Sequence, residues 1–185
     1  ILGQKPDLIL MEEGSGPPDA VSLIAQSGAD VVTVPAGYRA ENLPAKIRTI
    51  AAAVGETAKG EVLADETGRK LADLARAVET RTDRKRVLFI MSFNDGRPMA
   101  AGAGTAADAM IRLSGGENVL TGMNGYKTLS LEAAAALQPD VILMPNHAAP
   151  VGLSGNVLDV PAFADTPAGR NRALIRMDAL YLLGF

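Results

Sequence analysis

The sequence predicts an α/β fold of two Rossmann-like lobes with mainly parallel sheets. Three observations support this prediction. Short, continuous apolar runs alternate with helical segments, as in parallel sheets whose strands are buried on both faces. A long segment of helical periodicity, residues 59–81, separates two such groups. Finally, the phrase KPDLILM at 5–11 returns as QPDVILM at 138–144, once in each group.

Apolar runs bounded by turn residues predict the strands. These runs are DLILM at 7–11, DVVTV at 30–34, RVLFIMS at 86–92, DVILM at 140–144 and ALIRMD at 173–178. None of them alternates strictly between polar and apolar residues, which favours strands covered on both faces.

The segments between these runs predict helices at 17–28, 42–55, 59–81, 105–116 and 130–138. The first begins at Pro17 and ends at Gly28, as helices tend to. Thr105, followed three residues later by Asp108, resembles a capping box. Gly68 weakens the long helix without breaking it. Strands and helices in this order imply right-handed crossovers between parallel strands.

The repeated phrase marks the same transition in both groups. In each copy a helix ends before a proline, an aspartate follows, and aliphatic residues begin a strand. A residue that precedes proline disfavours the α-helical conformation, so the helix ends there for a steric reason. The two copies predict two similar lobes. The alternative is that Pro-Asp before an aliphatic run is simply a common way to enter a strand.

Composition excludes several classes of function. The chain has 185 residues, no cysteine, one histidine and a net charge of −3. It therefore has no disulfide or cysteine metal site, and no basic block suited to nucleic acid. No apolar run approaches the roughly 18 residues of a membrane span. The sequence has no G-x-S-x-G or HExxH motif, so we expect a protein that is not an enzyme.

Three longer strings carry a family resemblance: AAGAGTAADAMIRLSGGENVL at 100–120, GYKTLSLEAAAALQPDVILMP at 125–145 and TPAGRNRALIRMDALYLLGF at 166–185. Together they resemble the haem-binding substrate-binding proteins of bacterial ABC importers. The wider group also carries ferric siderophores and cobalamin. The resemblance implies two lobes joined by one long backbone helix, with the ligand in the cleft between them. The implied parts are an incomplete N-terminal lobe at 1–58, the helix at 59–82 and a C-terminal lobe at 83–185.

The resemblance also implies the ligand, partners and location. Haem is the expected transported ligand, without a catalytic cofactor, and the expected partners are an ABC permease and its ATPase subunit. The expected location is the periplasm, or a lipid anchor on the outer face of the cytoplasmic membrane. The alternative is a ferric-siderophore or cobalamin carrier of the same fold. We expect the chain to be an internal piece of a longer protein, with the iron-ligating tyrosine upstream of Ile1 and a C-terminal helix beyond residue 185.

Residues that follow predicted strands are candidates for the ligand cleft, because ligands of α/β folds bind at the carboxyl ends of strands. They are Tyr38 and Arg39, then Ser92, Phe93 and Asn94, and finally His147. Tyr38 and His147 are also candidates for iron ligation. The alternatives are surface packing for Tyr38, the core for Phe93 and plain polar surface for His147. Glu12 and Glu13 are candidates for the cleft rim or for helix caps.

The loop MAAGAGT at 99–105 is a further candidate for ligand contact. Backbone N–H groups at Gly104 and Thr105, before a helix, suit a propionate, and Met99 suits the face of a porphyrin. The alternative is a tight turn that needs glycine. The loop lacks the lysine of a nucleotide-binding P-loop.

Family resemblance assigns Glu132 to docking on the permease, although a carboxylate in a first helical turn also suits the helix dipole. Tyr126 is expected to order the loop before Glu132 rather than to contact ligand. Arg170 and Arg172 in PAGRNR are expected to brace the C-terminal lobe rather than to pair with a propionate.

Overall fold

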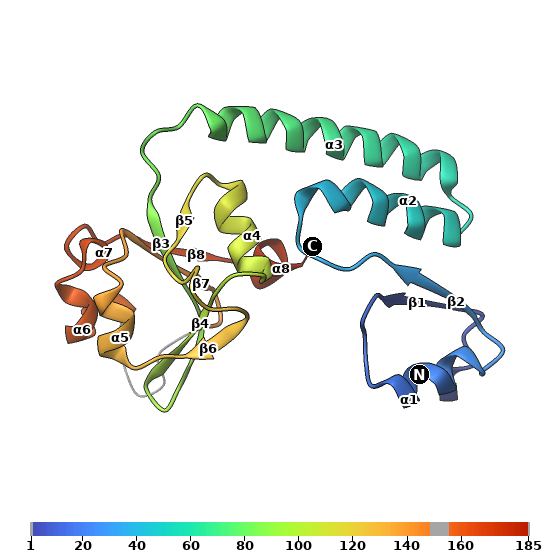
Figure 1. Cartoon of the computed structure of the whole chain (residues 1–185), viewed down its shortest axis with the longest axis horizontal. Coiled ribbons are helices and arrows are strands. Elements are labelled where there is room, and N and C mark those ends of the chain that lie inside the picture. The colour runs from blue at the N-terminus through green and yellow to red at the C-terminus, as the bar shows by residue number, and fades with distance from the viewer. Residues whose placement is uncertain (1, 149–155, 185) are drawn as a thin grey trace. The chain divides into compact units, whose positions relative to one another are not determined.

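The computed structural model describes residues 2–148 and 156–184 (Figure 1). The chain divides into two compact units, Ile1–Asp73 and Leu74–Phe185, and the division falls inside helix α3 (Thr57–Glu79). The long helix predicted at 59–81 therefore forms as one uninterrupted element that runs through Gly68. Across the described residues, none of the helices is both long and apolar enough to cross a membrane.

The first unit contains a small parallel sheet. Strand β1 (Leu8–Glu12) pairs with β2 (Asp30–Val34), with Leu8 opposite Asp30 and Glu12 opposite Val34. Helix α1 (Pro18–Ala25) connects them and begins with proline, as predicted. Short 3-10 helices η1 (Leu2–Gln4) and η2 (Ala40–Asn42) precede β1 and follow β2.

Little of this sheet is buried. Ile9 and Val34 are its buried apolar residues, α1 buries none, and the side chain of Leu23 is 62% exposed. A sheet of two parallel strands cannot bury both of its faces with so few residues. This thin core agrees with the prediction of an incomplete N-terminal lobe.

Helix α2 (Leu43–Ala53) packs closely against α3. A Cβ added at Gly60 would lie 2.2 Å from the Cβ of Ala51, so the two helices meet where neither can carry a larger side chain. At the edge of this contact, Arg48 of α2 pairs with Glu61 at 2.7 Å and with Asp65 at 2.6 Å.

The second unit is built on a mixed sheet with strand order β6-β4-β3-β7-β8. Central strand β3 (Arg86–Asn94) pairs in parallel with β7 (Val141–Pro145) and with short β5 (Glu117–Asn118), and β7 pairs in parallel with β8 (Leu174–Met177). Three of the five predicted strands supply this parallel part, which confirms the α/β prediction.

The other edge of the sheet is antiparallel, and its strands were not predicted. Strand β4 (Arg97–Ala101) folds back on β3, and β6 (Tyr126–Thr128) pairs with β4. Met99 therefore lies on a strand, and its assignment to a loop was wrong. Asp95 and Gly96 form the turn with φ of 50° and 73°, and this Asp-Gly pair is the sequence signal that predicts such a hairpin.

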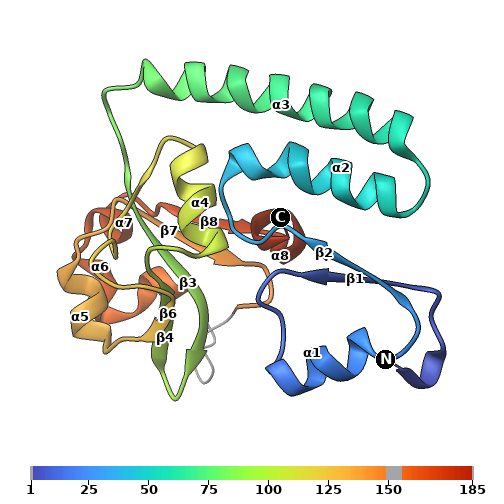
Figure 2. The same cartoon turned by 45° about the vertical axis from the view of Figure 1, so that its right-hand side comes forward.

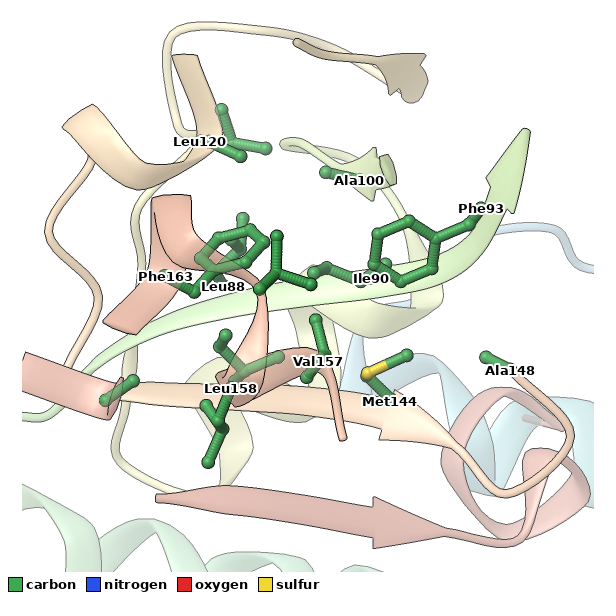
Figure 3. Close-up of a cluster of buried hydrophobic side chains, with 14 residues drawn as sticks. Leu88, Ile90, Phe93, Ala100, Leu120, Met144, Ala148, Val157, Leu158 and Phe163 are labelled. Atoms are coloured by element: carbon green, nitrogen blue, oxygen red, sulfur yellow. The ribbon is translucent and has the colours of Figure 1, made fainter. Parts of the chain in front are cut away.

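Helices cover both faces of this sheet. On one face, α5 (Leu131–Ala136), α6 (Pro161–Ala164), α7 (Pro167–Arg170) and η3 (Val157–Asp159) pack on a cluster that includes Leu88, Ile90 and Phe163 (Figure 3). On the other, α4 (Ala106–Leu113) and α8 (Ala179–Leu183) pack on Val87 and Phe89. Alternate residues of β3 thus enter different cores, which is why its sequence reads as a continuous apolar run.

The two copies of the repeated phrase share a backbone conformation and a hydrogen bond. Lys5 and Gln138, each directly before the proline, have positive φ of 49° and 47°. The Lys5 N–H donates to the Leu2 carbonyl at 3.0 Å, and the Gln138 N–H donates to the Ala135 carbonyl at 2.9 Å. A strand then begins in each copy. The repeat therefore encodes one helix-to-strand turn used twice.

Candidate functional site

The loop after β4 is hydrogen-bonded through its backbone to Met123 and Gly125. The N–H groups of Gly102 and Ala103 donate to the carbonyls of Gly125 and Met123 at 2.8 and 2.7 Å. A Cβ at Gly102 would lie 2.2 Å from the Met123 carbonyl oxygen. The Gly104 N–H donates to the Asp108 carboxylate at 3.3 Å. These contacts explain the glycines as a close-packed turn, the alternative interpretation of this segment.

Thr105 caps α4, as its spacing from Asp108 predicts. Its buried hydroxyl donates to the Gly102 carbonyl at 2.9 Å and accepts from the Asp108 N–H at 3.1 Å. The Asp108 carboxylate is itself buried and accepts from Asn118 at 3.0 Å and from Arg112. Contact of Gly104 or Thr105 with a ligand stays a prediction, and these internal bonds do not favour it.

The three predicted site residues at the end of β3 differ in burial and in the face of the sheet on which they lie. The side chain of Phe93 is 5% exposed and packs in the core cluster with Ile90 and Ala100, which favours the core interpretation (Figure 3). Ser92 is half-buried and Asn94 is exposed. A register shift between Ile90 and Ser92 returns Phe93 to the face of Ile90 and leaves Ser92 on the opposite face.

The antiparallel edge brings further side chains onto the face of Ser92. Ser92 lies opposite Met99, and Met99 lies opposite Thr128 in β6. Residues directly opposite in antiparallel strands share a face, and so do alternate residues along one strand. We call this surface the hairpin face; it consists of Ser92, Asn94, Arg97, Met99, Tyr126 and Thr128.

Four of these six residues, Ser92, Asn94, Met99 and Tyr126, are recognisable in the sequence, but no sequence pattern places them on one surface. Tyr126 was expected to order a loop, whereas it lies on β6, opposite Ala101, with a side chain that is 40% exposed. Arg97 and Thr128 were missed, because their place on the face follows from the unpredicted hairpin.

His147 lies in the turn after β7 and is exposed. The Arg176 guanidinium donates to the carbonyl of Ala148 at 2.7 Å and holds the backbone beside the histidine. No group of three His, Asp or Glu side chains in the described part of the chain is arranged to hold a metal ion. Iron ligation by His147 stays a prediction.

In the first unit, Tyr38 follows β2 and is 40% exposed. Its neighbour Arg39 pairs with Glu41 at 3.4 Å, and both side chains are exposed. The Glu41 pKa is lowered by its own backbone N–H and by Arg39. Glu12, the last residue of β1, pairs with Lys46 of α2 at 3.2 Å, and it does not cap α1, whose N-cap residue is Pro17. A place at the rim of a ligand cleft stays a prediction.

Glu132 lies in the first turn of α5 and is exposed. The Ser130 hydroxyl caps the helix by accepting from the Ala133 N–H at 3.1 Å. The pKa of Glu132 is lowered by a hydrogen bond from its own backbone N–H, and further by the Ser130 hydroxyl. The carboxylate is therefore ionised at neutral pH and available to a cation of a partner.

Arg170 and Arg172 bond within the C-terminal unit. Arg170 donates to the Asp165 carbonyl, and Arg172 pairs with Asp159. Both contacts tie α7 and the turn after it to neighbouring elements. They support the expected bracing role of these arginines.

Comparisons with known proteins identify the family of this fold. The family model described as periplasmic binding protein matches residues 1–181. Among solved structures, the periplasmic haem-binding protein BhuT, in complex with two haems, is 37% identical, with a TM-score of 0.88 over 99% of this chain and 70% of that chain. Apo RhuT from Roseiflexus sp. RS-1, also a periplasmic haem-binding protein, is 34% identical. Its TM-score is 0.85, and the match covers 99% of this chain and 71% of RhuT.

One curated relative is the uncharacterized ABC transporter substrate-binding lipoprotein YvrC of Bacillus subtilis (strain 168). It is 25% identical over 146 residues, which cover 77% of this chain and 46% of the relative. The chain thus spans about half the length of this relative. The family model covers nearly all of the chain, and the chain belongs to the periplasmic binding protein family.

Proposed function

We propose that the protein is the extracytoplasmic substrate-binding component of an ABC importer that captures haem and delivers it to a membrane permease. The observation that carries this proposal is the likeness to BhuT, which holds two haems and matches 99% of this chain at 37% identity. The likeness to RhuT adds a second haem-binding protein above 30% identity. A ferric-siderophore or cobalamin ligand has no comparable support.

Capture requires binding and orientation rather than chemistry. Haem is a planar apolar ring with two carboxylates, so a suitable site combines an apolar surface with cationic or hydrogen-bonding groups. Ser92, Asn94 and Met99 supply such a surface in the second unit. Tyr38, Arg39 and His147 remain candidates at the ends of β2 and β7. We expect no catalytic step and no cofactor other than the transported haem.

Delivery requires a partner in the membrane. We propose that Glu132 meets a cation of the permease, because it is exposed and ionised at neutral pH. Exposed ion pairs of this kind act mainly on orientation and on the rate of encounter. A separate ATPase subunit would supply the energy for release. The proposed location is the periplasm or, as the lipoprotein relative suggests, the outer face of the cytoplasmic membrane.

Titration of the full-length protein with haemin tests this proposal. We expect a saturable change in the Soret and visible bands, with a spectrum typical of tyrosinate-bound ferric haem. The same protein should not bind ferric siderophores or cobalamin at comparable concentrations. A protein that ignores haemin and binds one of those ligands would be a carrier of the same fold with a different cargo.

A further inference from the structure

The two faces of the antiparallel edge differ in chemistry. One face carries Phe93 and Ala100, which belong to the core cluster beneath α5 and α6. The hairpin face carries a thioether, a phenol, two hydroxyls, an amide and a guanidinium, from Met99, Tyr126, Ser92, Thr128, Asn94 and Arg97. Figure 2 shows β4 and β6 side by side at the end of β3, where these residues lie.

Along β4, exposure on this side of the sheet rises toward the tip of the hairpin. Ala101, at the base of β4, is fully buried in the cluster formed with α4 and α8. Met99, two residues further, is half-buried, and Arg97 is exposed. The surface therefore begins as core and becomes an open, amphipathic patch at the carboxyl end of β3.

Arg97 differs from the other arginines on described strands. Arg86 donates to the Leu137 carbonyl at 2.8 Å, and Arg176 donates to the Ala148 carbonyl at 2.7 Å. Within residues 2–148 and 156–184, Arg97 has neither a carboxylate nor a carbonyl partner. The guanidinium of Arg97 has no internal partner among the described residues and lies two residues from the thioether of Met99 on the same face, with Tyr126 further along that face. The face therefore offers an amphipathic anion both a cation and an apolar surface.

We infer that Arg97 is a specificity-determining residue that pairs with a propionate carboxylate of haem while the porphyrin edge lies on the hairpin face. This inference rests on the proposed function. A guanidinium matches a carboxylate with two parallel N–H···O bonds, and it keeps its charge at every physiological pH. The polarisable sulfur of Met99 and the ring of Tyr126 suit the edge of an aromatic macrocycle.

The test compares haemin with haemin dimethyl ester, in which both carboxylates are masked. Both ligands are titrated into the full-length protein and its Arg97→Gln and Arg97→Lys variants. The matched control is Arg84→Gln, because Arg84 is also exposed and has no partner among the described residues. We expect Arg97→Gln to weaken haemin binding about tenfold, the effect of losing one charge-assisted hydrogen-bonded pair.

Three results would support the inference together. Arg97→Gln binds the dimethyl ester as the wild type does, Arg97→Lys recovers part of the haemin affinity, and Arg84→Gln changes neither. Equal losses for haemin and its ester in Arg97→Gln would overturn it, because the arginine would then act on the shape of the hairpin. Unchanged haemin affinity would overturn it as well. If the wild type does not bind haemin, the proposed function fails, and the inference fails with it.

Discussion

In the loop after β4 and the first turn of α4, the contacts of individual residues were predictable where their partners are near in sequence. Thr105 and Asp108 are three residues apart, and the cap that they form follows from that spacing. The partners of Gly102 and Ala103 lie twenty or more residues away, at Gly125 and Met123. No local pattern reveals such contacts, so the segment at 99–105 was predicted to contact a ligand.

Glu132 provides a prediction about pH at the residue scale. Its pKa is lowered in the folded protein by the N–H and hydroxyl groups that bond its carboxylate. Its contribution to the stability of α5 is therefore complete above the unfolded-state pKa of about 4.5 and is lost as the pH falls through the lower folded-state value. Thermal midpoints of Glu132→Gln should lie below those of the wild type at pH 7 and converge with them near pH 3.

A matched pair of variants separates docking from capping at this helix end. Ser130→Ala removes the cap that accepts from Ala133 but keeps the charge of Glu132. If the carboxylate docks on the permease, Glu132→Gln slows haem uptake by the assembled transporter, whereas Ser130→Ala leaves uptake nearly unchanged. Both variants should bind haemin normally. Equal uptake by the two variants would leave Glu132 with a purely local role.

Strands were predictable where the sequence contains a continuous apolar run. The runs that became β3 and β7 are continuous and apolar because each strand faces two cores. Strand β4 begins with the exposed Arg97, and all three residues of β6 are exposed, so their sequences do not read as buried runs. The turn at Asp95 and Gly96 was the available signal, and the hairpin face depends on it.

The packing of α2 on α3 makes a prediction at the scale of elements. Replacing glycine by alanine inside a helix usually stabilises it by about 1 kcal/mol. At Gly60 the new Cβ would lie 2.2 Å from the Ala51 Cβ, so the two helices must move apart. We expect Gly60→Ala to destabilise the protein by about 1–3 kcal/mol, the range for an overpacked core, as measured by chemical denaturation.

Gly68 is the control within the same helix. A Cβ there would lie 3.7 Å from Pro44 Cγ, which is an ordinary contact. Gly68→Ala should therefore stabilise the protein by about 0.5–1 kcal/mol. Opposite signs at the two glycines would establish close packing of α2 on α3, and a gain in stability at both would contradict it.

At the scale of the whole chain, the repeated phrase and the long helix predicted two α/β parts, and the structure divides into two units. The parts differ in how much apolar surface they bury. The second unit holds two core clusters on the two faces of its sheet. The strands of the first unit bury Ile9 and Val34, and Leu10 remains 41% exposed. The sequence did not reveal this imbalance, because both parts contain similar aliphatic runs.

This imbalance predicts two levels of local stability. Backbone amides exchange with solvent through local openings, whose free energy rises with the apolar surface that holds an element in place. Amides of β1 and β2 should therefore exchange much faster than those of β3 and β7, which lie between two cores. Hydrogen–deuterium exchange of this chain, followed by mass spectrometry of its peptides, measures both sets in one sample. Uniform protection across the two sheets would show that the first unit gains stability from a source other than its own buried residues.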